Sequence, residues 1–84
     1  MKIEVTQEDI DKGVRFSGVN CPIARAFKRS TNTWTDLLVI RKEALCLEVS
    51  YGKFIPIKRF PPHVTDFINR LDRRELVGPF VFEL

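Results

Sequence analysis

Metal-binding and disulfide-forming side chains are scarce in this chain of 84 residues. It has one histidine and two cysteines, Cys21 and Cys46, which do not form a C-x-x-C pair. The usual ligands of a structural zinc ion therefore cannot be assembled. Two isolated thiols are typical of a reducing compartment rather than of a disulfide scaffold. The sequence predicts neither a metal nor a cofactor.

Long apolar runs are also missing. No stretch approaches the roughly 20 residues that a helix needs to cross a bilayer. Residues 1–6 lack the apolar segment of a signal peptide. We therefore expect a soluble, cytoplasmic protein that has no membrane partner.

Motifs of catalysis and phosphate binding are absent as well: there is no G-x-S-x-G, P-loop or G-x-G-x-x-G. His63 follows two prolines without an evident partner for general-base work, so a capping or surface role is favoured. Cys21 would be reactive if a helix start lowered its pKa, but a small apolar residue under that helix is the simpler interpretation. The acidic residues of the first helix, Asp9 among them, are expected on its surface. The sequence predicts no enzyme.

The apolar content is sufficient for one small core. Hydrophobic residues make up 44% of the chain and include seven phenylalanines, which argues against disorder. The length fits a single domain over residues 1–84. The net charge of +3 is mild. It is compatible with nucleic acid or a phosphate ligand, and equally with solubility alone.

The pattern along the chain predicts the element order βααβββαβ. Thr6 is expected to cap the first helix with Asp9 at the third position, and Gly13 to end it in a left-handed conformation. The expected elements are strands at 2–5, 34–41, 45–50, 53–58 and 80–84, and helices at 7–12, 20–30 and 62–72. We expect an α+β fold, with a mainly antiparallel sheet of about five strands and three helices packed on one face.

The hairpin between the third and fourth strands has two alternative registers. A two-residue loop sets Leu47 opposite Pro56. A three-residue loop with a left-handed glycine instead pairs Leu47 with Ile55, and Leu45 with Ile57. We expect the second register because it keeps apolar residues opposite each other. The strand that holds Pro56 is expected at a sheet edge or at a bulge, and an exposed edge leaves pairing of two copies open.

Residues 20–29 form the most informative stretch. Asn20 is a good N-cap, Pro22 suits the first helical position, and the face opposite the apolar stripe carries only positive charge. Free backbone N–H groups beside cationic side chains suit an anion. The residues expected to bind an anion or a partner are Arg15, Asn20, Cys21, Arg25, Lys28, Arg29 and Trp34.

Two features of this set have alternative explanations. Arg25 and Arg29 are like charges at i, i+4, which costs a few tenths of a kcal/mol. A phosphate, an acidic partner or water alone could balance them. Trp34 could stack on a nucleobase or close one end of the core.

Three segments of the chain resemble a family of short proteins encoded by bacteriophages and prophages. They are V-T-Q-E-D-I-x-x-G at residues 5–13, C-P-I-A at 21–24 and P-F-x-F-E-L at 79–84. The resemblance spans both ends of the chain and supplies no catalytic residue, because the family has no agreed activity. It implies a phage context in a host bacterial cell. By analogy, small phage proteins of this kind often act by binding, including inhibitors of host defence.

We therefore expect a non-catalytic phage accessory protein that binds and neutralises a host component. The expected target is a host-defence protein or a nucleotide-type signal, bound at the basic start of the second helix. The alternative is a nucleic-acid-binding module that contacts the phosphate backbone through the same face. It predicts an affinity that falls steeply as salt rises.

Overall fold

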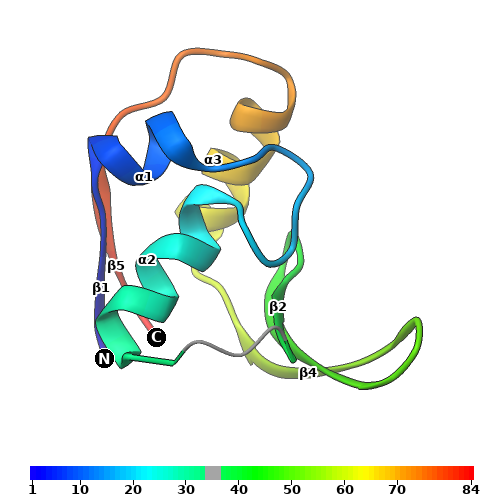
Figure 1. The fold of residues 1–84 in the computed structure, drawn as a ribbon. Helices are drawn as coiled ribbons and strands as arrows, with labels where there is room; N and C mark the ends of the chain where they lie inside the picture. Colours follow the sequence, from blue (N-terminus) through cyan, green and yellow to red (C-terminus); the bar gives the residue numbers. More distant parts are fainter. Residues whose placement is uncertain (34–36) are drawn as a thin grey trace.

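The described part of the chain forms three helices and two antiparallel sheets (Figure 1). The computed structural model describes residues 1–33 and 37–84. In chain order the elements are β1 (Lys2–Val5), α1 (Gln7–Lys12), α2 (Pro22–Thr31), β2 (Leu38–Ile40), β3 (Ala44–Ser50), β4 (Lys53–Arg59), α3 (Pro62–Asp72) and β5 (Phe80–Glu83). This arrangement confirms the predicted α+β class and the order βααβββαβ.

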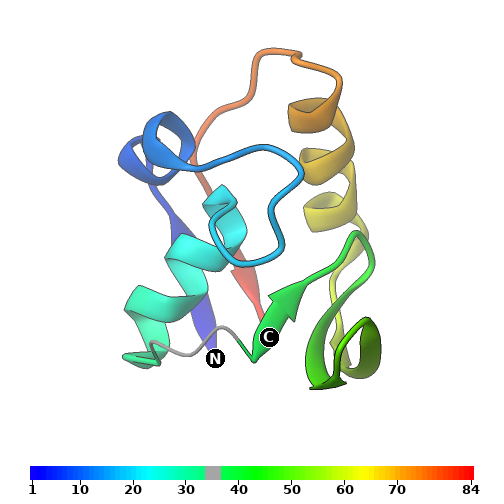
Figure 2. The same cartoon turned by 45° about the vertical axis from the view of Figure 1, so that its right-hand side comes forward.

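The strands form two sheets rather than the single sheet that we expected. β1 pairs with β5, while β2, β3 and β4 form a second sheet in that order. α2 packs against both β1 and β2, and in both views β1 (blue) and the β3–β4 hairpin (green) lie on opposite sides of the molecule (Figures 1 and 2). The pairing of β1 with β5 brings the chain ends together, and the Met1 amino group donates to the Leu84 carbonyl at 2.8 Å.

One hydrophobic core joins the two sheets and the helices. Val5 of β1, Ile23 of α2 and Val64 of α3 have no exposed surface. Phe67 and Leu71 of α3 are buried beside them. Val64, Phe67 and Leu71 belong to the i, i+3, i+4, i+7 stripe predicted from the sequence, so the apolar face of α3 is confirmed.

The middle of the β3–β4 hairpin has the predicted register, but its base does not. Leu47 lies opposite Ile55 as expected, whereas Leu45 lies opposite Lys58 instead of the expected isoleucine. A register shift between these pairs explains the difference. It lies next to Pro56, whose missing N–H cannot serve a regular ladder. β4 is also the last strand of its sheet, as predicted for the strand that holds Pro56.

The tip of the hairpin is shorter than expected. Ser50 lies opposite Lys53, so the loop consists of two residues, Tyr51 and Gly52, rather than three. A second register shift leaves Val49 without an opposite residue. Gly52 has a φ of +76°, which confirms the predicted left-handed glycine.

α1 begins as predicted and ends differently. The Thr6 side chain accepts from the Asp9 N–H, and the Asp9 side chain accepts from the Thr6 N–H. Gly13 follows the helix with a φ of −70°, so the expected left-handed conformation is wrong. Close packing explains this glycine, because a Cβ atom there would lie 2.6 Å from both the Asp9 carbonyl oxygen and Pro22 Cδ.

Candidate functional site

The N-cap of α2 is Cys21 rather than Asn20. Cys21 has extended backbone angles, and its Sγ accepts from the Ala24 N–H at 3.4 Å. Asn20 is held in the preceding loop: its carbonyl accepts from the Val14 N–H, and its own N–H donates to Ser17 Oγ, each at 2.9 Å. Because these loop contacts fix Asn20, the helix starts one residue later than the sequence suggested.

The first turn of α2 is covered by the protein. The N-cap residue and the first three helical residues are all buried: Cys21, Pro22, Ile23 and Ala24. The expectation that this helix start is open to water is therefore wrong. Burial of the apolar Pro22 and Ile23 against the core outweighs any preference of the helix end for solvent.

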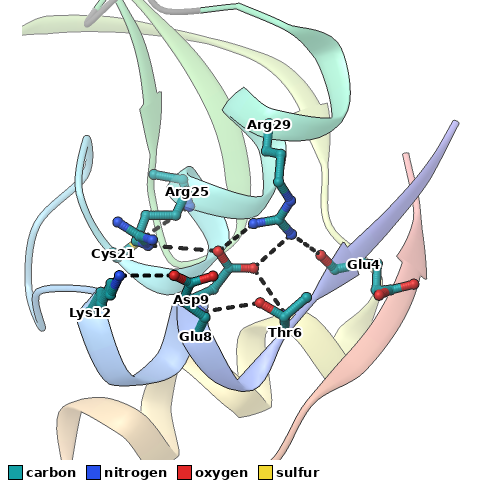
Figure 3. A network of polar contacts seen from close by, with 9 residues as sticks. Glu4, Thr6, Glu8, Asp9, Lys12, Cys21, Arg25 and Arg29 are labelled. Atoms are coloured by element: carbon teal, nitrogen blue, oxygen red, sulfur yellow. Dashed lines mark hydrogen bonds and ion pairs between the residues drawn. The ribbon is translucent and has the colours of Figure 1, made fainter.

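Two of the three cations expected beside this helix start contact Asp9 of α1 (Figure 3). Arg29 donates from Nη1 to Asp9 Oδ1 at 2.6 Å and from Nη2 to Oδ2 at 2.8 Å. Its Nη2 also donates to the Glu4 carbonyl at 2.8 Å. Arg25 Nε lies 3.6 Å from Asp9 Oδ1, and the Thr6 N–H donates to Oδ2 at 2.9 Å. We call Asp9, Arg25 and Arg29 the charge cluster.

The charge cluster contains two arginines and one carboxylate, so Asp9 balances one of its two positive charges. Asp9 is fully buried, so the expectation that it lies on the helix surface is wrong. Burial alone would raise the pKa of Asp9, but hydrogen bonds from Arg29 and Thr6 outweigh it and hold that pKa below its usual range. The bonds to Asp9 in turn raise the pKa of Arg29. A carboxylate of the same chain thus explains why two arginines are tolerated at i, i+4.

The other residues of the predicted site are dispersed. Lys28 donates from Nζ to the Val19 carbonyl at 2.8 Å. Arg15 is exposed on the loop before α2, where it lines a small surface pocket together with Asp11 and Arg74. Trp34 lies outside the described residues. The structure therefore brings Arg25 and Arg29 together around an internal anion and gives Arg15 different neighbours.

A cleft of about 690 Å³ lies between the β2–β3–β4 sheet, the start of α2 and α3. Val39, Cys46 and Pro56 line it together and lie opposite one another across the three strands. Cys21 and Ile68 contribute from the helices. The volume is within the range of roughly 300–1,000 Å³ that is typical of small-molecule sites. Sequence reasoning missed this cleft because its walls come from segments far apart in the chain.

Cys21, the candidate nucleophile, is unsuited to attack in this environment. Burial raises the pKa of its thiol, and the opposing effect of the Ala24 and Ile23 N–H groups does not compensate. The thiol is therefore neutral at physiological pH, whereas the thiolate is the reactive form. The geometry favours a role for Cys21 as helix cap and core residue.

The excess positive charge of the chain is concentrated in residues 41–59, which we call the basic hairpin. It comprises the β2–β3 turn, β3 and β4 and has a net charge of +3, equal to that of the whole chain. Its charged residues are Arg41, Lys42, Lys53, Lys58 and Arg59 against Glu43 and Glu48. The rest of the chain has nine basic and nine acidic residues. In Figure 1 the tip of this hairpin extends away from the helices.

The basic hairpin also exposes apolar side chains. Ile55 and Ile57 of β4 are 50% and 52% exposed, and Tyr51 at the tip is fully exposed. Among the described residues, β4 has one hydrogen-bonded neighbour strand, β3, and its other edge is unpaired. Lysines and a proline on such an edge also protect a protein against unwanted strand pairing. The hairpin is thus an exposed surface of mixed basic and apolar character.

Residues 1–33 and 37–84 contain no group of three or more His, Cys, Asp or Glu side chains arranged to hold a metal ion. Within the same ranges, no helix has the length and apolar character required to cross a membrane. Comparisons with protein-family models, with curated proteins and with solved structures found no match. The resemblance to a phage family therefore stays a prediction.

Proposed function

We propose that this chain is a small, non-catalytic phage accessory protein that binds and neutralises a host protein with an acidic surface. The basic hairpin, rather than the start of α2, is the proposed contact surface. The observation that carries this proposal is the location of the charge: the arginines of α2 contact Asp9 inside the molecule, whereas the hairpin holds the whole net charge of the chain. Complementary charge steers such partners together and fixes their orientation.

The apolar side chains of the hairpin favour a protein partner. Ile55 and Ile57 lie on β4 with Lys53, Lys58 and Arg59. Protein interfaces commonly combine an apolar centre with a charged rim, and an open strand edge can accept a partner strand. Two copies of β4 paired antiparallel would bring lysines and arginine of both copies together. Charge therefore disfavours self-pairing and favours an acidic partner.

Charge reversal on β4 tests this proposal. Lys53→Glu combined with Lys58→Glu changes two exposed residues that have no ion pair among the described residues. Arg15→Glu combined with Arg74→Glu is the matched control, since it makes the same change in net charge on exposed residues elsewhere. The wild type and both variants are immobilised and exposed at low salt to bacterial lysate, with and without prior nuclease treatment. Captured proteins are then eluted with rising salt and identified.

We expect an acidic protein that the wild type and the control retain and that the β4 variant loses. Elution by salt is expected because exposed charges are screened. Equal capture of the same protein by all three forms would show that β4 is not the contact surface. Loss of capture after nuclease treatment would point to the alternative function.

That alternative, nucleic-acid binding, is favoured by one specific observation. Tyr51 is fully exposed at the hairpin tip, two residues from Lys53. Aromatic side chains beside cations are typical of single-strand binding sites. Fluorescence anisotropy with labelled single-stranded DNA, double-stranded DNA and RNA at several salt concentrations tests it. Nucleic-acid binding predicts a salt dependence that the Lys53→Glu, Lys58→Glu variant makes shallower by about two units. No binding to any of these oligonucleotides excludes it.

A further inference from the structure

The cleft beside the β2–β3–β4 sheet shares the β2–β3 turn with the basic hairpin, but Lys53 and Lys58 do not line it. We infer that it binds a small amphipathic carboxylate, a molecule with an apolar body and one anionic head. This inference does not depend on the proposed function. It follows from the apolar walls of the cleft, the aromatic residues at its edge and the cations of the β2–β3 turn.

The walls of the cleft suit an apolar body. Val39, Cys46 and Pro56 form a row across the sheet, and Ile68 and Leu71 line the cleft from α3. These side chains offer little hydrogen bonding, so they accept alkyl or aromatic groups and disfavour strongly polar ones. Burial of apolar ligand surface then supplies most of the binding free energy.

Two phenylalanines from different segments of the chain line the cleft. Phe54 of β4 is partly buried, whereas Phe16, on the loop before α2, is 78% exposed. Phe16 has a φ of +62°, a conformation that bulky residues rarely adopt. Backbone strain of this kind is often found at ligand sites. An apolar ligand body that covered Phe16 would remove a large aromatic surface from water.

The head of the ligand is expected at the β2–β3 turn. The Arg41 guanidinium lies 4.6 Å from the centroid of the Phe54 ring, which holds it beside the cleft. Neither Arg41 nor Lys42 forms an ion pair within the described part of the chain. Glu43 also lines the cleft, but its carboxylate lies 3.6 Å from the Arg59 guanidinium. Two cations without a carboxylate partner therefore lie along this part of the cleft.

Asp72 restricts the orientation in which an anionic ligand can bind in the cleft. It lines the cleft from the end of α3 and would repel an anionic head placed beside it. The head is thus directed to Arg41 and Lys42. Both side chains belong to the β2–β3 turn, and a guanidinium and an ammonium can each donate a charge-assisted hydrogen bond to a carboxylate.

Calorimetric titration with dodecanoate and with dodecyltrimethylammonium, both below their micelle concentrations, tests the inference. The two probes share an apolar chain and differ in the charge of the head. We expect dodecanoate to bind with a stoichiometry of one, and the cationic probe to bind at least about ten-fold more weakly. Equal affinity for both probes, or binding that does not saturate, would overturn the inference.

Variants at the turn locate the head. Arg41→Glu combined with Lys42→Glu is expected to weaken dodecanoate binding about ten-fold or more. The Lys53→Glu, Lys58→Glu variant makes the same change in net charge and is expected to bind dodecanoate within about two-fold of the wild type. Unchanged binding in the turn variant would refute the site. Circular dichroism checks the fold, and Arg41→Gln replaces the turn variant if that one does not fold.

The two proposals can fail separately. Loss of dodecanoate binding in the turn variant, with no protein captured by the wild type, would support the cleft and reject the proposed function. Capture of an acidic protein that depends on Lys53 and Lys58, without binding of dodecanoate, would support the proposed function and reject the cleft as a carboxylate site.

Discussion

Replacing Asp9 by asparagine tests the role of the charge cluster in stability. Asparagine keeps the size of the side chain and an oxygen that can accept from the Thr6 N–H. It removes the charge that Arg29 contacts at 2.6 and 2.8 Å and that Arg25 approaches at 3.6 Å. The variant therefore leaves two guanidinium groups beside a fully buried, neutral amide.

The size of the effect follows from burial. Removal of one partner from a buried ion pair costs about 3–5 kcal/mol. The Arg29 side chain is 44% exposed, so water can hydrate part of its charge. We therefore expect a loss of about 2–3 kcal/mol, below that range. A domain of this length has a free energy of unfolding of roughly 4–13 kcal/mol, so the loss is large but leaves the protein folded in most of that range.

Urea unfolding at pH 7, followed by circular dichroism, measures this loss. For a slope of about 1 kcal/mol per molar urea, the midpoint should fall by about 2–3 M. Asp11→Asn is the control, because it removes the same charge from an exposed residue of α1 whose side chain accepts from Gln7. We expect it to cost less than about 0.5 kcal/mol. Equal stability of the two variants would refute the assigned role of Asp9.

The pH dependence provides an independent check on Asp9. Its pKa is lowered in the folded protein from the usual value of 3.8. The stabilisation is therefore complete above that value and is lost as the pH falls through the lower pKa of the folded state. The difference between wild type and Asp9→Asn should be constant from about pH 5 to 8 and should shrink below 3.8. A difference that grows in acid would contradict this sign.

Three further predictions concern close packing and the thiols. Gly13→Ala should cost about 1–3 kcal/mol in the same urea assay, because its Cβ would lie 2.6 Å from two atoms. Gly78→Ala, where no atom lies within 4 Å of the new Cβ, should stay within about 0.5 kcal/mol of the wild type, and equal losses would count against this packing. Cys21 and Cys46 are largely buried, although both line the cleft, so a disulfide reagent should label them more slowly in the folded protein than in urea, and equal rates would show that the thiols are accessible. Cys21→Ser should keep the cap of α2, whereas Cys21→Val should be about 1 kcal/mol less stable than Cys21→Ser, and equal stability would argue against a capping role.

Features that depend on near neighbours in the chain were predictable. The Thr6–Asp9 capping box and the apolar stripe of α3 each lie within a few residues. The pairing of Leu47 with Ile55 follows from a short hairpin loop and from the match of apolar residues across it. The rest of that hairpin was not predictable, because the position of a bulge depends on how the strand accommodates Pro56.

The partner of the α2 arginines depends on a contact that the sequence does not encode locally. Two like charges at i, i+4 indicated that an anion balances them, but not which one. Asp9 and Arg29 are twenty positions apart, and they meet because α1 packs against α2. The capping box contained a partial signal, since it turns Asp9 toward the start of α1. The N-cap is Cys21 instead of Asn20 because of hydrogen bonds within the preceding loop, and sequence preferences for N-cap residues do not take such contacts into account.

The division of the strands into two sheets could not be predicted from the local sequence pattern either. Strand patterns give neither the partner of each strand nor the position of a helix between them. Within the described residues, β1 and β5 pair with each other and with no other strand, and α2 packs against both β1 and β2. The cleft depends on this arrangement, and so it was not visible in the sequence.

A titration with pyrophosphate, followed through the amide chemical shifts of the wild type, tests most directly where this protein presents its positive charge. If Asp9 occupies the arginines of α2 and the basic hairpin carries the free charge, the shifts will concentrate in residues 41–59. The amides of Ile23, Ala24 and Arg25 will then stay unchanged. Shifts centred on those three amides, with little change in residues 41–59, would contradict this assignment.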